Sequence, residues 1–424
     1  MVIVENQKEV GEFLQLWNAE SSVVVPIWVD LEKHPLNNQL AFIYVKFSRY
    51  EYILPFNHTD CKSIQIELSQ SDTPKWVWNK KGLLQTDLGI GNTYDIQAEQ
   101  FFTLNKMLDF KPEEQPFISH YHKLGIRTEL GKIAPIMKWV EYLQSFTKDI
   151  VPLPFDFDKE WIDDTMIPIL SDIERYGVRV VGEKFFDRFP QATKHLHNDI
   201  LYTHYNPYTI TSRPSNRFGG INFSALNKSD GTREVFVPKE GHIFLQMDYD
   251  AYHPRIIGKL VGYQLPQTSV HQWLADQYGV PYDESKGITF QLLYGGIPEE
   301  FDSIPYYKKV REYIQLLWEV SMGEGFLQTH KRKIPLGRIE GCNPQKVFNY
   351  LLQATETELN MVKLRKILEF IKGTPIELTL YTYDSFLFSI PTDVDMGMVK
   401  RLKEIIEGGG FPIKASWGMD YDKL

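Results

Sequence analysis

The chain has little cysteine, with only Cys61 and Cys342 among its 424 residues. Two cysteines cannot form a disulfide framework, and they are too few for a cysteine-based zinc site. No apolar run reaches the roughly 18–20 residues that a membrane span needs. The first residues, MVIVENQKEVGEF, lack the basic and apolar regions of a secretory signal. We therefore expect a cytoplasmic protein that does not bind membranes.

An excess of positive charge is also missing, since the formal net charge is -9. This argues against a protein that coats polyanions without selectivity, but a local basic channel would suffice to bind nucleic acid. The run at residues 330–333 contains Lys331 and Arg332 and is followed by Arg338. These side chains are candidate DNA contacts, although such a run alone is more often a solvated surface.

Hydrophobic residues make up 43% of the chain, which excludes global disorder, and the length suits two or three domains. The first part is rich in β-type runs, which predict strands at residues 22–29, 40–47 and 50–56. Helices are predicted at residues 95–108 and 136–146. Two prolines at residues 149–158 indicate a linker.

The second part predicts an α+β arrangement with a small antiparallel sheet. One helix is expected at residues 162–176, ending at Gly177. Residues 178–210 show no clear pattern. A strand is expected at residues 241–249, and a hairpin at 376–383 and 386–390 with Asp384 and Ser385 at its tip. Further helices are predicted at residues 255–262, 271–278, 283–294 and 344–370.

Asp248 and Asp384 each stand at the end of an apolar strand. Carboxylates there can project from a packed sheet without being buried unpaired. Two of them on adjacent strands can hold the two Mg²⁺ ions that phosphoryl transfer uses to stabilise its attacking and leaving oxygens. Either aspartate alone is more often ordinary turn chemistry.

Lys286, Phe290 and Tyr294 are spaced to share one helix face, where a lysine reaches a triphosphate and rings meet a base. An amphipathic core helix with an extended lysine explains the same spacing. Asp30 and Glu32 follow the first long strand. They are typical of a metal-ligand pair in an RNase H-like nuclease, or else they are a polar strand exit.

Taken in order, these segments resemble the DNA polymerase I family (family A DNA polymerases). The resemblance covers about residues 160–424 and rests on motifs in conserved order: MIPILSDIERYGVRV, TSRPSN, MDYDAYHPRIIGKLVGY, KGITFQLLYG, FNYLLQATETELNMVKL, the YDS tripeptide and the ending IKASWGMDYDKL. The N-terminal part resembles the family's 3'–5' exonuclease domain at VVVPIWVDLEKHPLNNQLAFIYVKF and YDIQAEQFFTLN.

The resemblance implies roles residue by residue. Asp248, Asp384 and the Tyr249 carbonyl would bind metal, while Lys286 and His271 would bind the triphosphate. Phe290 would lie by the incoming sugar and Tyr294 by the templating base. The minor-groove side of the primer terminus, whose acceptors vary little with sequence, would be contacted by Arg213, Asn349 and Gln353.

The sequence departs from the family at several of these positions. Tyr282 stands where the fingers helix usually has an arginine, and His253 replaces the glutamate that excludes ribose 2'-hydroxyls. The family's histidine before the second metal-binding aspartate is replaced here by Tyr383, and its glutamate after that aspartate is replaced by Ser385. Only 36 positions separate Gly177 from Arg213, where the family has a thumb of more than a hundred residues, so weak retention on DNA is expected.

The nuclease motifs are incomplete, because the expected second aspartate falls on Gly82 or Leu83 and no Tyr-x3-Asp is found around residues 132–146. Asp30 and Glu32 would be a vestigial exonuclease pair. We expect a degenerate RNase H-like α/β domain at residues 1–150. A right-hand polymerase domain with little or no thumb would follow at 151–424, with its palm at 160–262 and 320–424 and shortened fingers at 263–319.

The predicted function is template-directed DNA synthesis from dNTPs on primer-template DNA, using two Mg²⁺ ions, or Mn²⁺ instead. A protein that improves processivity or supplies a thumb is the expected partner. Its setting would be phage or mobile-element replication in a bacterial cell. The alternative is a catalytically weak or inactive primer-template scaffold of a replisome, favoured by the missing thumb, Tyr282 and Ser385. RNA synthesis is a third and weaker interpretation, because His253 leaves sugar selection open.

Overall fold

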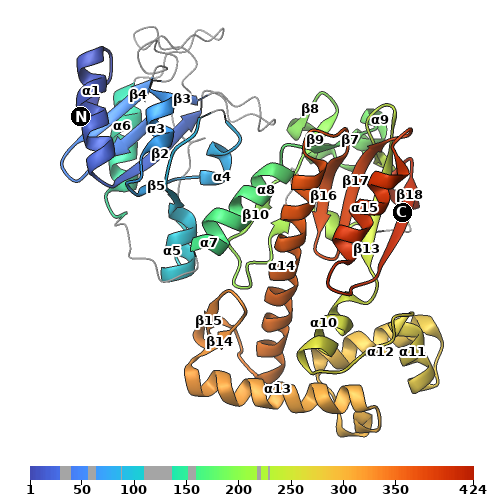
Figure 1. Ribbon diagram of the computed structural model, residues 1–424. Coiled ribbons are helices and arrows are strands. Elements are labelled where there is room, and N and C mark those ends of the chain that lie inside the picture. Colours follow the sequence, from blue (N-terminus) through green and yellow to red (C-terminus); the bar gives the residue numbers. More distant parts are fainter. Residues whose placement is uncertain are drawn as a thin grey trace. The chain divides into compact units, whose positions relative to one another are not determined.

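The structure is a computed structural model that describes residues 1–28, 40–55, 64–86, 88–108, 136–150, 159–216, 221–227 and 230–424. The chain forms two compact units, Met1–Arg175 and Tyr176–Leu424 (Figure 1). Both units mix helices with sheets, so the predicted mixed class is confirmed. The predicted linker lies mostly outside the described residues, and the predicted domain limits stay predictions.

The first unit is built on a six-stranded sheet in the order β1-β4-β3-β2-β5-β6. Its strands are β1 (Val2–Ile3), β2 (Ser22–Trp28), β3 (Leu40–Lys46), β4 (Glu51–Pro55), β5 (Lys75–Val77) and β6 (Thr93–Asp95). The central strands β2 and β3 are buried almost throughout, which explains why their sequences are continuous apolar runs without alternation. The three predicted strands are confirmed.

Helices cover both faces of this sheet. The helices of the first unit around this sheet are α1 (Gln7–Ala19), α3 (Gln65–Gln70), α4 (Lys80–Leu83), α5 (Ile96–Leu104) and α6 (Ile136–Thr147). Phe13 and Trp17 of α1 pack against one face, and Trp139 and Leu143 of α6 belong to the core on the other. Helix α1 was not predicted. Asp30 and Glu32 lie outside the described residues.

The predicted helix at residues 162–176 forms as α7 (Lys159–Trp161), a π-helical turn (Ile162–Met166) and α8 (Ile167–Ile173). The π-helical turn carries Asp163, which is fully buried. Its Oδ1 accepts hydrogen bonds from the Asp95 backbone N–H at 2.7 Å and from Lys80 Nζ at 3.2 Å. A second buried ion pair joins Lys81 to Glu174 at 2.5 Å. These contacts hold the segment from α7 to α8 against α4.

Replacing Asp163 by asparagine is expected to change how stability depends on pH. Burial, only partly opposed by Lys80, raises the pKa of Asp163 from 3.8 to about 6. The folded chain therefore keeps a proton that the unfolded chain releases, and the free energy of unfolding falls as pH rises from about 4 to 6. Asparagine cannot ionise, so between about pH 4 and 6 the free energy of unfolding of Asp163→Asn should rise by about 2 kcal/mol relative to that of wild type.

Urea unfolding of the full chain at several pH values measures this shift. Asp164→Asn is the matched control, because the neighbouring Asp164 side chain is half exposed. Parallel pH profiles for wild type and Asp163→Asn would contradict the prediction.

The second unit has a central antiparallel sheet in the order β16-β17-β13-β18. Its strands are β13 (His242–Tyr249), β16 (Glu377–Thr382), β17 (Ser385–Pro391) and β18 (Ile413–Gly418). The predicted strand and hairpin are therefore confirmed, whereas β18 was not predicted. Asp248 on β13 lies directly opposite Ser385 on β17 and Lys414 on β18. This register fixes which side chains meet at one end of the sheet.

Short strands fill the segment that had no clear sequence pattern. A second sheet has the order β12-β7-β9-β8, formed by β7 (Gly177–Val180), β8 (Leu196–His197), β9 (Ile200–Tyr202) and β12 (Phe236–Val237). Two ribbons pair β10 (Tyr205–Asn206) with β11 (Ser215–Asn216), and β14 (Phe326–Gln328) with β15 (Lys333–Pro335). Phe185 of α9 (Gly182–Arg188) shares a core with Phe244 of the central sheet.

Six further helices are α10 (Tyr252–Leu260), α11 (Val270–Tyr278), α12 (Tyr282–Gly295), α13 (Pro305–Glu324), α14 (Pro344–Ile371) and α15 (Met396–Glu407). Pro344 begins α14, and the Asn343 side chain caps it by accepting from the Lys346 N–H. Figure 1 shows α14 running from the central sheet to α13. Helices α13 and α15 were not predicted. Within the described ranges, no helix combines the length and apolarity needed to cross a membrane.

Candidate functional site

The two predicted metal-binding aspartates come together at one end of the central sheet. Asp248 is paired with Ser385, and the Tyr249 backbone N–H donates to the Asp384 carbonyl oxygen at 3.0 Å. Both carboxylates also act electrostatically on the buried Tyr421 phenol, whose pKa is raised first by burial and further by them. The two acids, 136 residues apart in the sequence, therefore share one neighbourhood.

Asp384 is held in an environment that favours its protonated form. Asp384 is exposed at the hairpin tip. The protein around its carboxylate still limits its solvation and raises its pKa, and the nearby Glu356 carboxylate raises it further, although a backbone hydrogen bond, His253 and Arg213 oppose this. A cation beside Asp384 would favour its charged form.

The available donors fit magnesium chemistry. In the part of the chain that the structure describes, no three His, Cys, Asp or Glu side chains are grouped to hold a metal. Magnesium does not require such a cage, because it is usually bound by one or two carboxylates together with substrate phosphates and water. The carboxylates of Asp248 and Asp384 and the Tyr249 carbonyl are hard oxygen donors of that kind.

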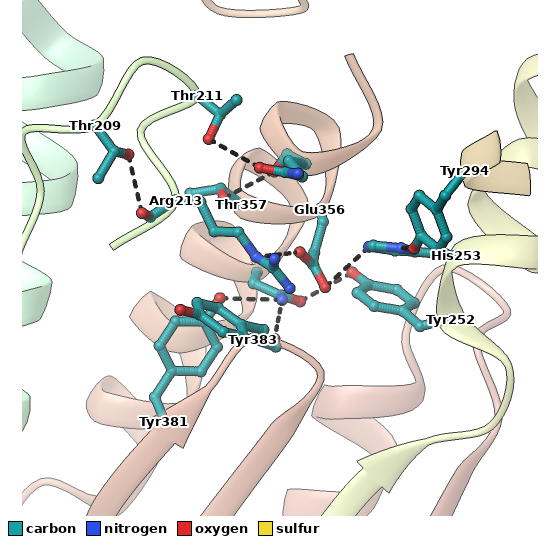
Figure 2. Close-up of polar contacts among 12 residues, drawn as sticks. Thr209, Thr211, Arg213, Tyr252, His253, Tyr294, Glu356, Thr357, Tyr381 and Tyr383 are labelled. Atoms are coloured by element: carbon teal, nitrogen blue, oxygen red, sulfur yellow. Dashed lines mark hydrogen bonds and ion pairs between the residues drawn. The ribbon is translucent and has the colours of Figure 1, made fainter. Parts of the chain in front are cut away.

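Glu356 of α14 is the centre of an ion-pair network that the sequence did not predict (Figure 2). The Glu356 side chain is 1% exposed. Its Oε2 lies 2.9 Å from Arg213 Nε, and its Oε1 lies 3.2 Å from His253 Nε2. The other His253 nitrogen, Nδ1, is hydrogen-bonded to the Tyr294 hydroxyl. One unpredicted carboxylate thus contacts two predicted site residues, Arg213 and His253, and His253 links it to a third, Tyr294.

The backbone just before Asp384 adopts an unusual conformation. Tyr383 has φ = 61°, the left-handed region that a bulky residue rarely occupies. Arg213 stacks on the Tyr383 ring at 3.6 Å, and Asn360 Nδ2 donates to the Tyr383 carbonyl at 2.5 Å. Asn360 Oδ1 in turn accepts from the Tyr252 hydroxyl at 2.9 Å. Contacts from other segments thus support the conformation of the hairpin tip.

One face of α14 presents four polar side chains at helical spacing: Asn349, Gln353, Glu356 and Asn360. Asn349 Nδ2 donates to the Tyr294 carbonyl at 3.4 Å, and Gln353 Oε1 accepts from the Thr211 hydroxyl at 3.5 Å. The sequence predicted roles only for the first two. The repeat at 349, 353, 356 and 360, which places polar residues on one face of the helix, was the signal that could have identified the others.

Helix α12 brings the predicted lysine and aromatic rings onto one face. The Phe290 and Tyr294 rings stack with centroids 5.9 Å apart, and Phe290 is 47% exposed. Lys286 Nζ lies 4.4 Å from the Tyr282 ring centroid. His271 of α11 is buried next to Tyr282 and Phe290. Burial lowers the pKa of His271, and the charge of Lys286 lowers it further.

The Tyr294 hydroxyl connects α12 to His253 of α10, the helix that follows β13. Burial raises the pKa of Tyr294, and the charges of Glu356 and Asp384 contribute in the same direction, while Arg213 opposes them. The face of α12 that carries Lys286 and Tyr294 is therefore next to the end of the sheet that carries the paired aspartates.

The predicted basic run divides into residues with different surroundings. Arg332 is buried and donates to the Ile210 carbonyl at 3.1 Å and to the Ser212 hydroxyl. Burial lowers the pKa of Arg332 to about 9. Lys331 is half-buried, and its backbone N–H donates to Glu358 at 3.0 Å. Arg332 supports the loop before Arg213, and DNA contact by either residue stays a prediction.

Comparison with known proteins shows the fold. No family model and no curated protein matches the chain by sequence. Among solved structures, it is similar to the POL domain of Pol1 from M. smegmatis, determined in complex with DNA primer-template and dNTP. The TM-score is 0.71 with 13% sequence identity, and the alignment covers 100% of both chains. The chain therefore has a fold similar to that of a DNA polymerase domain.

Proposed function

We propose that the chain is a template-directed DNA polymerase of the family A type, adding nucleotides from dNTPs to a primer 3'-hydroxyl. The observation that supports it best is the position of Asp248 and Asp384 on adjacent strands at the same end of an antiparallel sheet, next to the α12 face with Lys286 and Tyr294. The similarity to a polymerase domain supports the proposal at the level of fold.

In the proposed reaction the primer 3'-oxygen forms a bond to the α-phosphorus of the dNTP. The bond from that phosphorus to the bridging oxygen breaks, pyrophosphate leaves, and the hydroxyl proton passes to solvent. Asp248, Asp384 and the Tyr249 carbonyl would hold two Mg²⁺ or Mn²⁺ ions, which stabilise charge on the attacking and leaving oxygens. Lys286 and His271 orient the triphosphate.

The remaining residues would position the DNA and the sugar. Phe290 and Tyr294 lie along one face of α12 and are assigned to the incoming sugar and the templating base. His253, bonded to the Tyr294 hydroxyl, is assigned to the sugar's 2' side. The primer terminus is assigned to residues on or facing α14, which are Arg213, Asn349 and Gln353.

The proposal extends to the rest of the chain. The short interval between Gly177 and Arg213 supports a polymerase with little or no thumb, which would rely on a protein partner to remain on DNA. The incomplete nuclease motifs support an exonuclease-like first domain without activity. A reduced enzyme of this kind suits phage or mobile-element replication.

Primer extension tests the proposal. The purified chain is incubated with a 5'-labelled primer on a DNA template, four dNTPs and Mg²⁺ or Mn²⁺. We expect extension that stops at the template position where one dNTP is withheld. Binding of primer-template without extension on DNA or RNA templates, with either ion, would instead support the scaffold interpretation. Incorporation of NTPs in preference to dNTPs would indicate RNA synthesis.

A further inference from the structure

A lysine that the sequence did not single out lies beside the first of the paired aspartates. Lys414 on β18 is the direct cross-strand neighbour of Asp248 on β13. Directly opposed residues of an antiparallel pair lie on the same face of the sheet. The Lys414 side chain is 63% exposed, and its Nζ lies 2.6 Å from Asp250 Oδ1. A cation is therefore fixed at this end of the sheet and remains accessible to solvent.

The carboxylate that holds Lys414 already has a cationic partner. Asp250 is buried, and its Oδ2 lies 3.2 Å from Arg255 Nη2. Arg255 is buried as well, and it donates to the carbonyls of Asp250, Pro266 and Thr268 at 2.8 Å each. Two cations thus share one carboxylate. The cluster of Asp250, Arg255 and Lys414 carries a net positive charge, and its exposed part is Lys414.

The charges of this cluster and of Lys286 both influence the buried imidazole of His271. His271 experiences the charge of Lys286 on α12 together with the charges of Lys414, Arg255 and Asp250. Lys414 also interacts electrostatically with Tyr282, whose ring lies beside both His271 and Lys286 Nζ. The two lysines therefore border one region, Lys414 from the sheet and Lys286 from α12.

We propose that Lys414 binds the triphosphate of the incoming nucleotide from the sheet side, opposite Lys286. The inference rests on the proposed function. A nucleoside triphosphate carries several negative charges, and ammonium groups bind phosphate oxygens through charge-assisted hydrogen bonds. The buried Asp250 and Arg255 pre-position Lys414, which reduces the entropy lost when it binds phosphate.

Steady-state incorporation of a single dNTP tests this assignment with Lys414→Gln, which removes the charge, and Lys414→Arg, which keeps it. Loss of a hydrogen bond to a charged group should raise KM for dNTP about 10- to 100-fold in Lys414→Gln, with a smaller change in kcat. Lys414→Arg should restore most of the affinity. The matched control is Lys239→Gln, because Lys239 is a half-exposed lysine that also pairs with a carboxylate, that of Glu377.

A binding measurement separates this inference from the proposed function. Calorimetric titration with dTTP and with inorganic pyrophosphate, in the presence of primer-template, should show weaker binding of both by Lys414→Gln. Unchanged KM and binding in an active enzyme would overturn the role of Lys414 and leave the polymerase proposal intact. A lower kcat with unchanged KM would also overturn it, because Lys414 would then act only through Asp250. Lys414-dependent binding without incorporation would support the triphosphate site and refute the polymerase proposal.

Discussion

Asp384→Asn is expected to lower primer extension by at least about 10³-fold, because it removes one of the two carboxylates proposed to hold metal. Charge stabilisation by a bound cation amounts to several kcal/mol of the barrier, which corresponds to a rate factor of this size. Single-turnover incorporation of one dNTP measures the loss. The folded protein should be about as stable as wild type, since Asp384 is exposed at the hairpin tip and the nearby Glu356 carboxylate disfavours its charged form.

Asp393→Asn is the matched control for this experiment. Asp393 is exposed just beyond the other end of β17, on the same hairpin as Asp384. Wild-type rates are expected for the control. Extension by Asp384→Asn at more than a tenth of the wild-type rate, with the same dependence on Mg²⁺, would show that this carboxylate does not support the chemistry.

Glu356→Ala is expected to impair both stability and activity. The substitution leaves Arg213 and His253 without the buried carboxylate that they share. Breaking a buried pair by removing one partner costs about 3–5 kcal/mol, and we expect the lower end because Arg213 is partly exposed. Activity should fall about 10- to 100-fold, the usual effect of losing a group that orients site residues. Urea unfolding and primer extension measure the two effects.

Glu369→Ala is the control for Glu356, because it changes the same residue type at an exposed position of the same helix. It should leave stability and activity close to wild type. A Glu356→Ala variant with wild-type stability would show that the network contributes little to the fold. Wild-type activity in that variant would show that Arg213 and His253 do not need this carboxylate for their proposed roles.

The elements nearest the site were predicted well because their local signals are strong. The strand ending at Asp248, the hairpin around Asp384 and the helix carrying Lys286 each combine an apolar pattern with a clear stop. Helices α1 and α13 and strand β18 were missed. The pattern of β18 mixes apolar and polar residues, and its place in the sheet is fixed by pairing with β13, which sequence alone does not reveal.

The connections within the candidate site could not be predicted, because they join residues far apart in the chain. Nothing in the sequence indicates that Glu356 meets Arg213, 143 positions earlier, or that Lys414 meets Asp250. Such pairs depend on register and on helix orientation in three dimensions. The fold of the second unit determines both. The geometry was therefore needed to find the contacts that Glu356, Asn360 and Lys414 make.

Tyr383, the residue before Asp384, has a left-handed backbone conformation that connects the hairpin tip to the loop carrying Arg213. Its backbone conformation is costly for a bulky residue, and it is maintained by stacking from Arg213 and a hydrogen bond from Asn360. Displacing Arg213 would remove one of these two contacts. The loop proposed to contact the primer terminus therefore also supports the backbone beside Asp384, one of the two acids proposed to bind metal.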